Sequence, residues 1–150
     1  MEEQILDAPA DVEKKLNYAG FWIRVAAVFI DSILMYLVFF GAAFLFLGGL
    51  ESFATGGMNI TFQLIFAVAG ILYFAGMESS SRQGTLGKMA VGIKVGNARG
   101  EQLSFANALG RYFAKIVSTI ILYIGFMMVG WDKKKQGLHD KIAGTYVFYK

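Results

Sequence analysis

The sequence predicts an α-helical integral membrane protein, and three observations lead to that class. Of the 150 residues, 56% are hydrophobic and only 17% are charged, whereas soluble domains carry about 25% charged residues. Two long stretches, residues 32–50 and 52–77, contain no charged side chain, and no basic residue lies between Arg24 and Arg82. A soluble domain of this length could not cover so much apolar surface, so lipid must solvate part of the chain.

The composition also excludes several classes of protein. The chain has no cysteine and a single histidine, which excludes a disulfide framework, a thiolate metal site and a histidine-rich metal site. Its length excludes a large multidomain enzyme. The net charge is only +3, and the basic residues follow the expected cytoplasmic face of a membrane, so we expect no nucleic-acid partner. We likewise expect no metal, no cofactor and no enzymatic activity.

The chain begins with an acidic segment. Residues 1–13 hold five acidic side chains, whereas a secretory signal opens with basic ones. Residues 1–16 are therefore predicted to form a mobile cytoplasmic tail, and residues 17–149 the membrane domain. Tyr18, Phe21 and Trp22 follow the tail, and aromatic rings of this kind suit the headgroup level of a bilayer.

Two full transmembrane helices are predicted, near residues 22–47 and 59–77, because a span needs about 20 mostly apolar residues. The loop between them, residues 48–58, is short, glycine-rich and free of basic residues, whereas residues 78–115 hold six of them. Lysine and arginine favour the cytoplasmic side of a membrane. We therefore expect a multi-pass protein of the inner (plasma) membrane, with the N-terminus and residues 78–115 in the cytoplasm.

The segment after the second span combines two small elements. Residues 93–95 alternate like a strand and precede a turn at residues 97–100, which predicts a small β-hairpin. Ser104 is a candidate N-cap for a helix that starts at Phe105. With Arg111 and Lys115 on its polar side, this cytoplasmic amphipathic helix is suited to the membrane surface.

A third apolar segment, residues 116–131, is predicted to be helical and allows two interpretations. Its 16 residues would form a helix of about 24 Å, which is short for a crossing. The favoured interpretation is a re-entrant hairpin or two half-helices bent near Gly125, which returns the basic tail, and thus the C-terminus, to the cytoplasm. The alternative is a single crossing in which Lys115 snorkels. Residues 145–149 resemble a strand that could pair with residues 93–95.

Arg24 and Asp31 are charged residues within the first predicted span. They lie seven residues apart, about 10 Å along one helix face and too far for a direct ion pair. A charge near the bilayer centre costs from about 2.5 kcal/mol upward, so both side chains must find polar partners. Asp31 is interpreted either as a structural acid, hydrogen-bonded to Ser32 or to Asn or Tyr groups of another helix, or as a cation or proton site.

A second polar cluster lies near the C-terminus, where His139, Asp140 and Lys141 stand between Gly137 and Gly144. No serine or cysteine nucleophile accompanies the His-Asp step, so a hydrolase is not expected. The glycines allow the chain to turn back, and Asp140 is predicted to pair directly with Arg24. Exchanging the two charges is then expected to recover part of the stability that each single replacement removes.

These motifs together resemble the RDD family of small membrane proteins, named for one arginine and two aspartates. The matching segments are AGFWIRVAAVFIDSIL, GTLGKMAVGIKV with an NARG turn, LSFANALGRYFAKI and QGLHDKIAGTYVF. The resemblance assigns the three name-giving residues to Arg24, Asp31 and Asp140, with Asp132 as a competitor for the last. It implies a bacterial plasma-membrane protein. Some family members are linked to sodium/proton antiport, and others in eukaryotes are partners in membrane quality-control complexes.

Two functional hypotheses follow. In the first, Arg24, Asp31 and Asp140 form a structural polar network, supported by Ser32, Lys88 and His139, in a structural or adaptor protein that binds a partner through its basic surface. In the second, an oligomer exchanges H⁺ with Na⁺ or another small cation at Asp31. The expected partners are the lipid bilayer and a second copy of the chain or another membrane protein, with Na⁺ or H⁺ in the second hypothesis.

Overall fold

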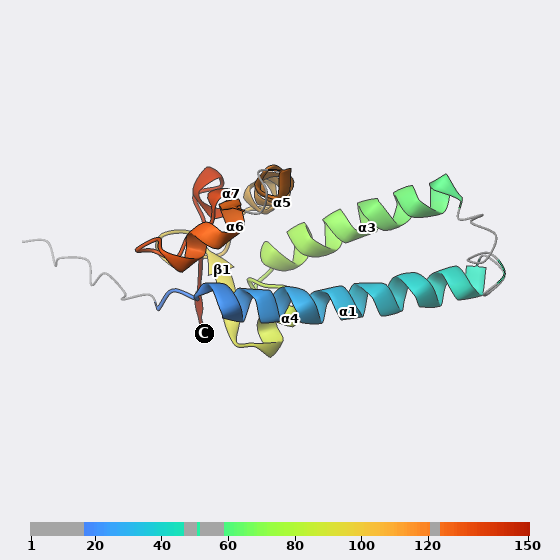
Figure 1. The fold of residues 1–150 in the computed structure, drawn as a ribbon, viewed down its shortest axis with the longest axis horizontal. Coiled ribbons are helices and arrows are strands. Elements are labelled where there is room, and N and C mark those ends of the chain that lie inside the picture. Colours follow the sequence, from blue (N-terminus) through green and yellow to red (C-terminus); the bar gives the residue numbers. More distant parts are fainter. Residues whose placement is uncertain (1–16, 47–50, 52–58, 121–123) are drawn as a thin grey trace, which may run out of the picture.

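The computed structural model describes residues 17–46, 51, 59–120 and 124–150. Two long helices, α1 (Phe21–Phe46) and α3 (Ile60–Glu78), run antiparallel and project from a compact group of smaller elements (Figure 1). Both are long and apolar enough to cross a membrane, and they match the predicted spans to within one residue. The predicted tail, residues 1–16, lies outside the described residues, as does most of the loop between the spans.

Most side chains of α1 and α3 face outward although they are apolar. Phe29, Leu37 and Phe44 of α1 are each at least half exposed, and so are Leu64 and Val68 of α3. Such a surface is unfavourable in water and favourable in lipid. The structure therefore supports a membrane protein whose hairpin presents its apolar side chains to the bilayer.

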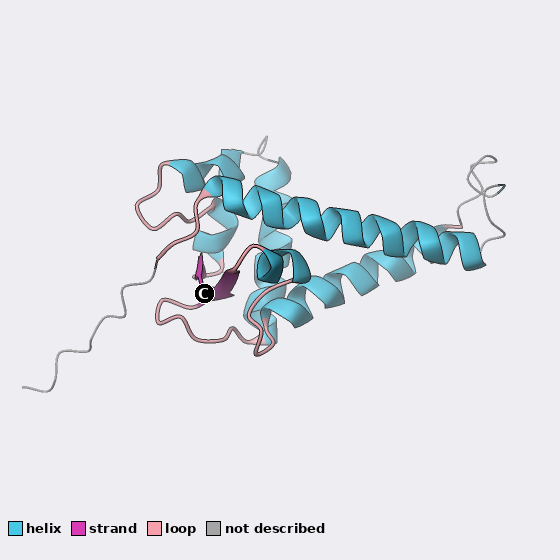
Figure 2. Ribbon diagram, turned by 90° about the horizontal axis from the view of Figure 1, so that it is seen from below, coloured by secondary structure: helices cyan, strands magenta, loops and turns pink. Residues whose placement is uncertain are grey.

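We call the smaller elements, with residues 17–20, the cap. Helix α4 packs along α1, while α5 packs against α3 and α7. Helix α5 is seen nearly end-on in Figure 1 and crosswise to α1 in Figure 2, so it runs across the hairpin axis. The cap elements are α4 (Leu86–Ala90), β1 (Ile93–Gly96), α5 (Phe105–Ile120), α6 (Ile124–Met127), the 3₁₀ helix η1 (Met128–Gly130), α7 (Leu138–Ile142) and β2 (Tyr146–Tyr149).

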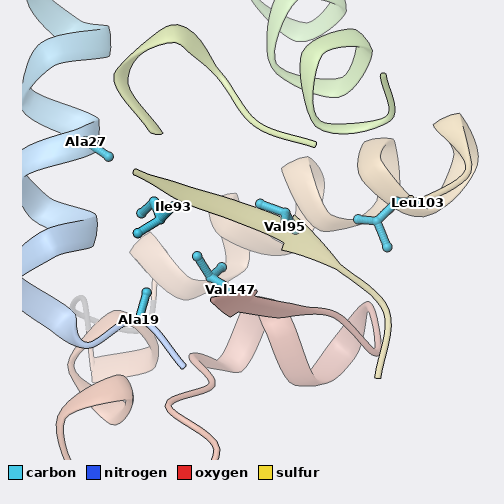
Figure 3. Close-up of a cluster of buried hydrophobic side chains, with 6 residues drawn as sticks. All are labelled: Ala19, Ala27, Ile93, Val95, Leu103 and Val147. Carbon is cyan, nitrogen blue, oxygen red and sulfur yellow. The ribbon is translucent and has the colours of Figure 1, made fainter. Parts of the chain in front are cut away.

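The cap contains a two-stranded antiparallel sheet in which Ile93 of β1 faces Tyr149 of β2 and Gly96 faces Tyr146. The predicted pairing of residues 93–95 with the C-terminal strand is confirmed, but the predicted hairpin is wrong. The turn after β1 leads to α5 instead of a partner strand, because Val147 supplies the apolar side chain that Ile93 and Val95 need (Figure 3). These side chains, with Ala19, Ala27 and Leu103, form the small core of the cap.

The first and last described segments lie side by side. The backbone N–H of Ala19 donates to the carbonyl of Val147 (2.9 Å), and that of Tyr149 donates to the carbonyl of Asn17 (2.9 Å). The residues that lead into α1 therefore extend the edge of the sheet next to β2. The two described chain ends consequently sit at the same end of the α1–α3 hairpin.

The predicted amphipathic helix exists as α5, and Ser104 caps it by accepting a hydrogen bond from the Asn107 N–H (3.2 Å). The charged face of this helix points into the protein, whereas the charged face of an ordinary amphipathic helix points into water. Arg111 is buried and Lys115 is largely buried against Glu78 at the end of α3, whereas four large apolar side chains point outward. The charged face turns inward because two carboxylates lie beneath it. The exposed apolar side chains are Phe105, Phe113, Ile116 and Val117.

The predicted third segment, residues 116–131, is divided between several elements. Residues 116–120 are the last residues of α5, and residues 124–130 form the short helices α6 and η1, while residues 121–123 lie outside the described part. Within the described residues, only α1 and α3 meet the length and composition of a membrane span.

Candidate functional site

Asp31 is the one acidic residue of α1, and three hydrogen-bond donors surround it. Its Oδ1 accepts from the Gly87 N–H (2.8 Å) and from the Tyr73 hydroxyl (3.1 Å), and its Oδ2 accepts from the Thr85 hydroxyl. The side chain is 2% exposed, so these donors replace water. Asp31 thereby holds the first turn of α4 against α1, and Tyr73 ties α3 to the same point.

The close approach of α4 to α1 depends on a glycine. A Cβ at Gly87 would lie 2.1 Å from the carbonyl oxygen of Ala27 and 2.7 Å from Cγ of Asp31. Ala27 is itself fully buried. No larger residue fits between the two backbones, so the small residues at positions 27 and 87 set the distance at which Asp31 meets α4.

Asp140 is fully buried in α7 and is held by two arginines. Nη1 of Arg24 pairs with Oδ2, and Nη2 of Arg111 lies 3.0 Å from Oδ1. The Gly137 N–H also donates to Oδ2 (3.1 Å). Burial by itself raises the pKa of Asp140. The charges of Arg111, His139 and Arg24 together lower it by more than burial raises it, so the pKa lies well below the usual range of an aspartate. The predicted contact between Arg24 and Asp140 is confirmed.

Arg24 makes further contacts that fix its guanidinium. Nε donates to the carbonyl of Ala19 (3.1 Å), and Nη2 donates to the carbonyl of Lys135. The fork of donors in one arginine thus connects the start of α1 with α7 and with the loop before it. Arg24 pairs with Asp140, whereas Asp31 accepts its hydrogen bonds from α3 and α4, so the predicted network of these three residues is divided into two clusters. The spacing of Arg24 and Asp31 along the helix accounts for this separation.

Glu78, the last residue of α3, forms a third buried cluster. Its side chain is 1% exposed, and Nζ of Lys88, Nζ of Lys115 (3.2 Å) and Nε of Arg111 (3.4 Å) surround it. Arg111 is 2% exposed and lies between Glu78 and Asp140, so it connects the two clusters. Removing a partner from such a buried group costs about 3–5 kcal/mol, because a charge is left uncompensated.

The supporting residues predicted from the sequence have different surroundings. Lys88 is buried next to Glu78, and burial lowers its pKa to about 7. Ser32 lines a cavity between α1 and α3, and among the described residues it makes no hydrogen bond to Asp31. Asp132, the competitor of Asp140, is a surface acid paired with Lys141 (2.7 Å). The geometry thus favours Asp140 as the buried partner of Arg24.

Several residues of the three buried clusters were not predicted from the sequence. Glu78 ends an uncharged stretch of 26 residues, which was a visible signal for a buried acid. Tyr73 fits the expected tyrosine partner of Asp31, but its position was not identified. Arg111 gave no signal, because an arginine on an amphipathic helix normally faces water. Thr85 was visible only as the first residue of the TLGK motif.

His139 is buried beside Asp140, with Nε2 3.4 Å from Oδ1, and its ring packs on Phe126 at 4.9 Å between centroids. Burial lowers the pKa of His139 to about 3, so the folded protein keeps the ring neutral at physiological pH. His139 is the only histidine of the sequence, so a change in stability between pH 5 and 7 involves no other imidazole group.

We expect the stability of the protein to fall as the pH drops below about 6.5. In that range the unfolded chain protonates His139 while the folded protein does not, so protons favour unfolding. The loss at pH 5 is about 2 kcal/mol relative to pH 7. Unfolding titrations in detergent micelles measure it, and His139→Phe, which keeps an aromatic ring beside Phe126, should reduce the slope. An identical slope in both proteins would contradict the neutral buried histidine.

The clusters contain carboxylates but no arrangement for a metal. Within the described residues, no group of three His, Cys, Asp or Glu side chains could hold one. Instead, cations or backbone N–H and hydroxyl donors already occupy the carboxylates. The arrangement therefore connects α1, α3, α4, α5 and α7 through buried charges.

Comparisons with known proteins find several bacterial relatives of the chain. The chain is 42% identical to the uncharacterized protein YxaI of Bacillus subtilis, over 88% of this chain and 97% of that protein. It is 31% identical to the uncharacterized membrane protein YteJ of Bacillus subtilis, over 100% of this chain and 93% of that protein. A proline-rich antigen of Mycobacterium leprae is 31% identical over 60% of this chain and 36% of its own length. No solved structure matches the fold. The RDD family model matches residues 18–144, which include Arg24, Asp31 and Asp140, and the chain belongs to the RDD family.

Proposed function

We propose that the protein is a structural or adaptor protein of the bacterial inner membrane. In this proposal α1 and α3 cross the bilayer twice, the buried charge network fastens the cap to the cytoplasmic end of this hairpin, and the cap presents a binding surface. The chain carries out no catalytic step of its own. The observation that carries the proposal concerns the buried carboxylates of the described residues, Asp31, Glu78 and Asp140: each is bound by groups of the cap or the hairpin.

The proposed orientation is supported by the distribution of charge and by the arrangement of the chain ends. The hairpin has no basic residue between Arg24 and Arg82, whereas the cap carries most of the cations. Lysine and arginine favour the cytoplasmic side, so we place the cap and both chain ends there. A reporter fused after Lys150 should be active only in the cytoplasm, and external activity would overturn this topology.

A partner would bind the basic surface formed by the cations that are not buried in the charge network. Lys88 and Arg111 are buried in the network, so they do not contribute to this surface. Other cations of the cap remain exposed on the side that we place in the cytoplasm. They attract anionic lipid or an acidic segment of a partner membrane protein, at about 1 kcal/mol per residue near a membrane surface. The exposed cations are Arg82, Arg99, Lys133, Lys134, Lys141 and Lys150.

The transport hypothesis makes a different prediction at Asp31. An exchange site must release its ligands to admit Na⁺ or H⁺, whereas all three donors to Asp31 come from elements that it holds together. We therefore expect no cation-coupled proton flux above that of empty vesicles in proteoliposomes containing the wild-type protein. Asp31→Asn should also complement cells that depend on the protein, because the amide retains one acceptor and the Thr85 hydroxyl can accept from its N–H.

The two variants Asp31→Asn and Asp31→Ala form a matched pair. The alanine variant leaves Thr85, Tyr73 and the Gly87 N–H without their acceptor, and we expect it to lose both stability and complementation. Flux that appears with the wild type and disappears with Asp31→Asn would support the transporter and contradict the adaptor.

A further inference from the structure

A groove runs between α1 and α3 on the side where α5 crosses them. Its volume is about 430 Å³, and Ser32, Met35 and Phe39 of α1 line it together with Gly70 and Phe74 of α3 and Tyr112 of α5. The wall is apolar except for a few hydroxyl groups. Because Gly70 has no side chain, α3 leaves the groove open at its centre; a Cβ there would meet only Cε of Met35, at 3.8 Å.

The groove has the length and direction of an acyl chain of one leaflet. Its wall on α3 extends from Phe66 to Phe74, which is about 12 Å along a helix. Half the hydrocarbon thickness of a bilayer is about 15 Å. The Phe74 end lies next to the cap and the Phe66 end lies further into the hairpin, so a lipid chain that enters from the cap side runs parallel to both helices.

A cation stands at the cap end of the groove. Nζ of Lys115 lies 5.6 Å from the ring centroid of Phe74, and that ring lies 6.0 Å from the ring of Tyr112. Both rings line the groove, and Lys115 follows Tyr112 by one turn of α5. The Lys115 side chain keeps 25% of its surface exposed, unlike the other two cations around Glu78.

The cluster around Lys115 holds more positive than negative charge. Glu78 is its only carboxylate among the described residues, whereas Lys115 and Arg111 contribute two cations, and Lys88, with a pKa of about 7, adds part of a third. Arg111 is shared with Asp140, but Asp140 is also paired with Arg24. An anion near Lys115 would therefore neutralise part of the excess positive charge. Basic pockets between transmembrane helices on the cytoplasmic side bind acidic lipid headgroups.

We propose that the groove binds an anionic phospholipid of the cytoplasmic leaflet. One acyl chain lies between α1 and α3 against Gly70 and Phe74, and the phosphate meets Lys115 at the level of Glu78. This inference rests on the proposed membrane placement of the hairpin, but not on the adaptor role. The ligand would fill the opening between the two helices and stabilise α5 across their end.

The experiment reconstitutes the full chain in lipid nanodiscs that contain equal amounts of phosphatidylglycerol and phosphatidylcholine. Native mass spectrometry then measures which lipid stays with the released protein. We expect phosphatidylglycerol to be retained in preference, and Lys115→Gln to reduce that preference about fivefold, which corresponds to about 1 kcal/mol for one cation near the membrane. Lys115→Arg should keep the preference, because it retains the positive charge at the cap end of the groove.

A second variant tests the apolar part of the groove and keeps the proposal testable if Lys115→Gln does not fold. Gly70→Leu places a side chain in the groove, and we expect it to reduce retention of both lipids while the protein still inserts. Equal retention of the two lipids by the wild type would overturn the lipid site, as would unchanged selectivity in Lys115→Gln. A dimer cross-linked through position 70 would show that a second copy occupies the groove instead. A chain that fails to enter the bilayer would overturn the membrane placement itself.

Discussion

Asp140→Ala is expected to lower the free energy of unfolding by about 3–5 kcal/mol, the largest effect among the charged residues. The change leaves the Arg24 guanidinium without a carboxylate, and Arg111, which is 2% exposed, keeps only Glu78 as its carboxylate partner. It also removes the acceptor for the Gly137 N–H at the start of α7. Reversible unfolding in mixed micelles measures the loss, and the amount of protein in the membrane should fall with it.

Asp132→Ala is the matched control. Asp132 is also an aspartate in an ion pair, but its partner is Lys141, whose side chain is 43% exposed, and such solvent-accessible pairs contribute about 0–1 kcal/mol. Equal losses in the two variants would show that burial at position 140 does not matter.

The double exchange Arg24→Asp with Asp140→Arg, expected from the sequence to recover stability, now has the opposite expected result. An arginine at position 140 would face Arg111, which lies 3.0 Å from the present carboxylate. We therefore expect the double variant to be no more stable than either single variant. Recovery in the double variant would show that Arg111 turns away when the charges are exchanged.

Gly87→Ala is expected to destabilise the protein by about 3 kcal/mol, at the upper end of the usual cost of overpacking. The added methyl group would lie 2.1 Å from a backbone carbonyl of α1, which no side-chain rotation can relieve. α4 must then move away from α1, and the hydrogen bond from the Gly87 N–H to Asp31 is lost with it. The measurement is the free energy of unfolding, combined with protease sensitivity of the segment around α4.

Gly110→Ala provides the matched control in a helix. Nothing lies within 4 Å of a Cβ at this position of α5, so the change should be neutral or stabilising by up to about 1 kcal/mol. A Gly87→Ala protein as stable as Gly110→Ala would show that α1 and α4 are not in close contact.

The sequence was sufficient for the elements whose signal is local. The absence of charges located α1 and α3, and the alternation of residues 93–95 and 145–149 identified both strands and their pairing. The energetic cost of a buried charge was enough to expect polar partners for Arg24 and Asp31 and to choose Asp140 for the former. Each of these inferences depends on a few neighbouring residues or on one strong energetic term.

The remaining features depend on contacts between distant segments. The inward orientation of Arg111 follows from the positions of Glu78 and Asp140, which lie 33 residues before it and 29 after it. The predicted hairpin was wrong for a similar reason, because the residues that pair with β1 lie 50 to 56 positions later in the chain. The need for glycine at position 87 became visible only when α4 was placed against α1.

The separation of Arg24 from Asp140 also has a consequence during biosynthesis. The two residues are 116 positions apart, so in the proposed membrane placement the first helix enters the bilayer long before the acid that neutralises its arginine has been made. At a translation rate of about 5–20 residues per second, this interval lasts about 6–23 s. During that time the arginine of the nascent chain has no carboxylate partner at position 140. A chain interrupted before residue 140 never leaves that state, so the buried pair distinguishes finished molecules from unfinished ones.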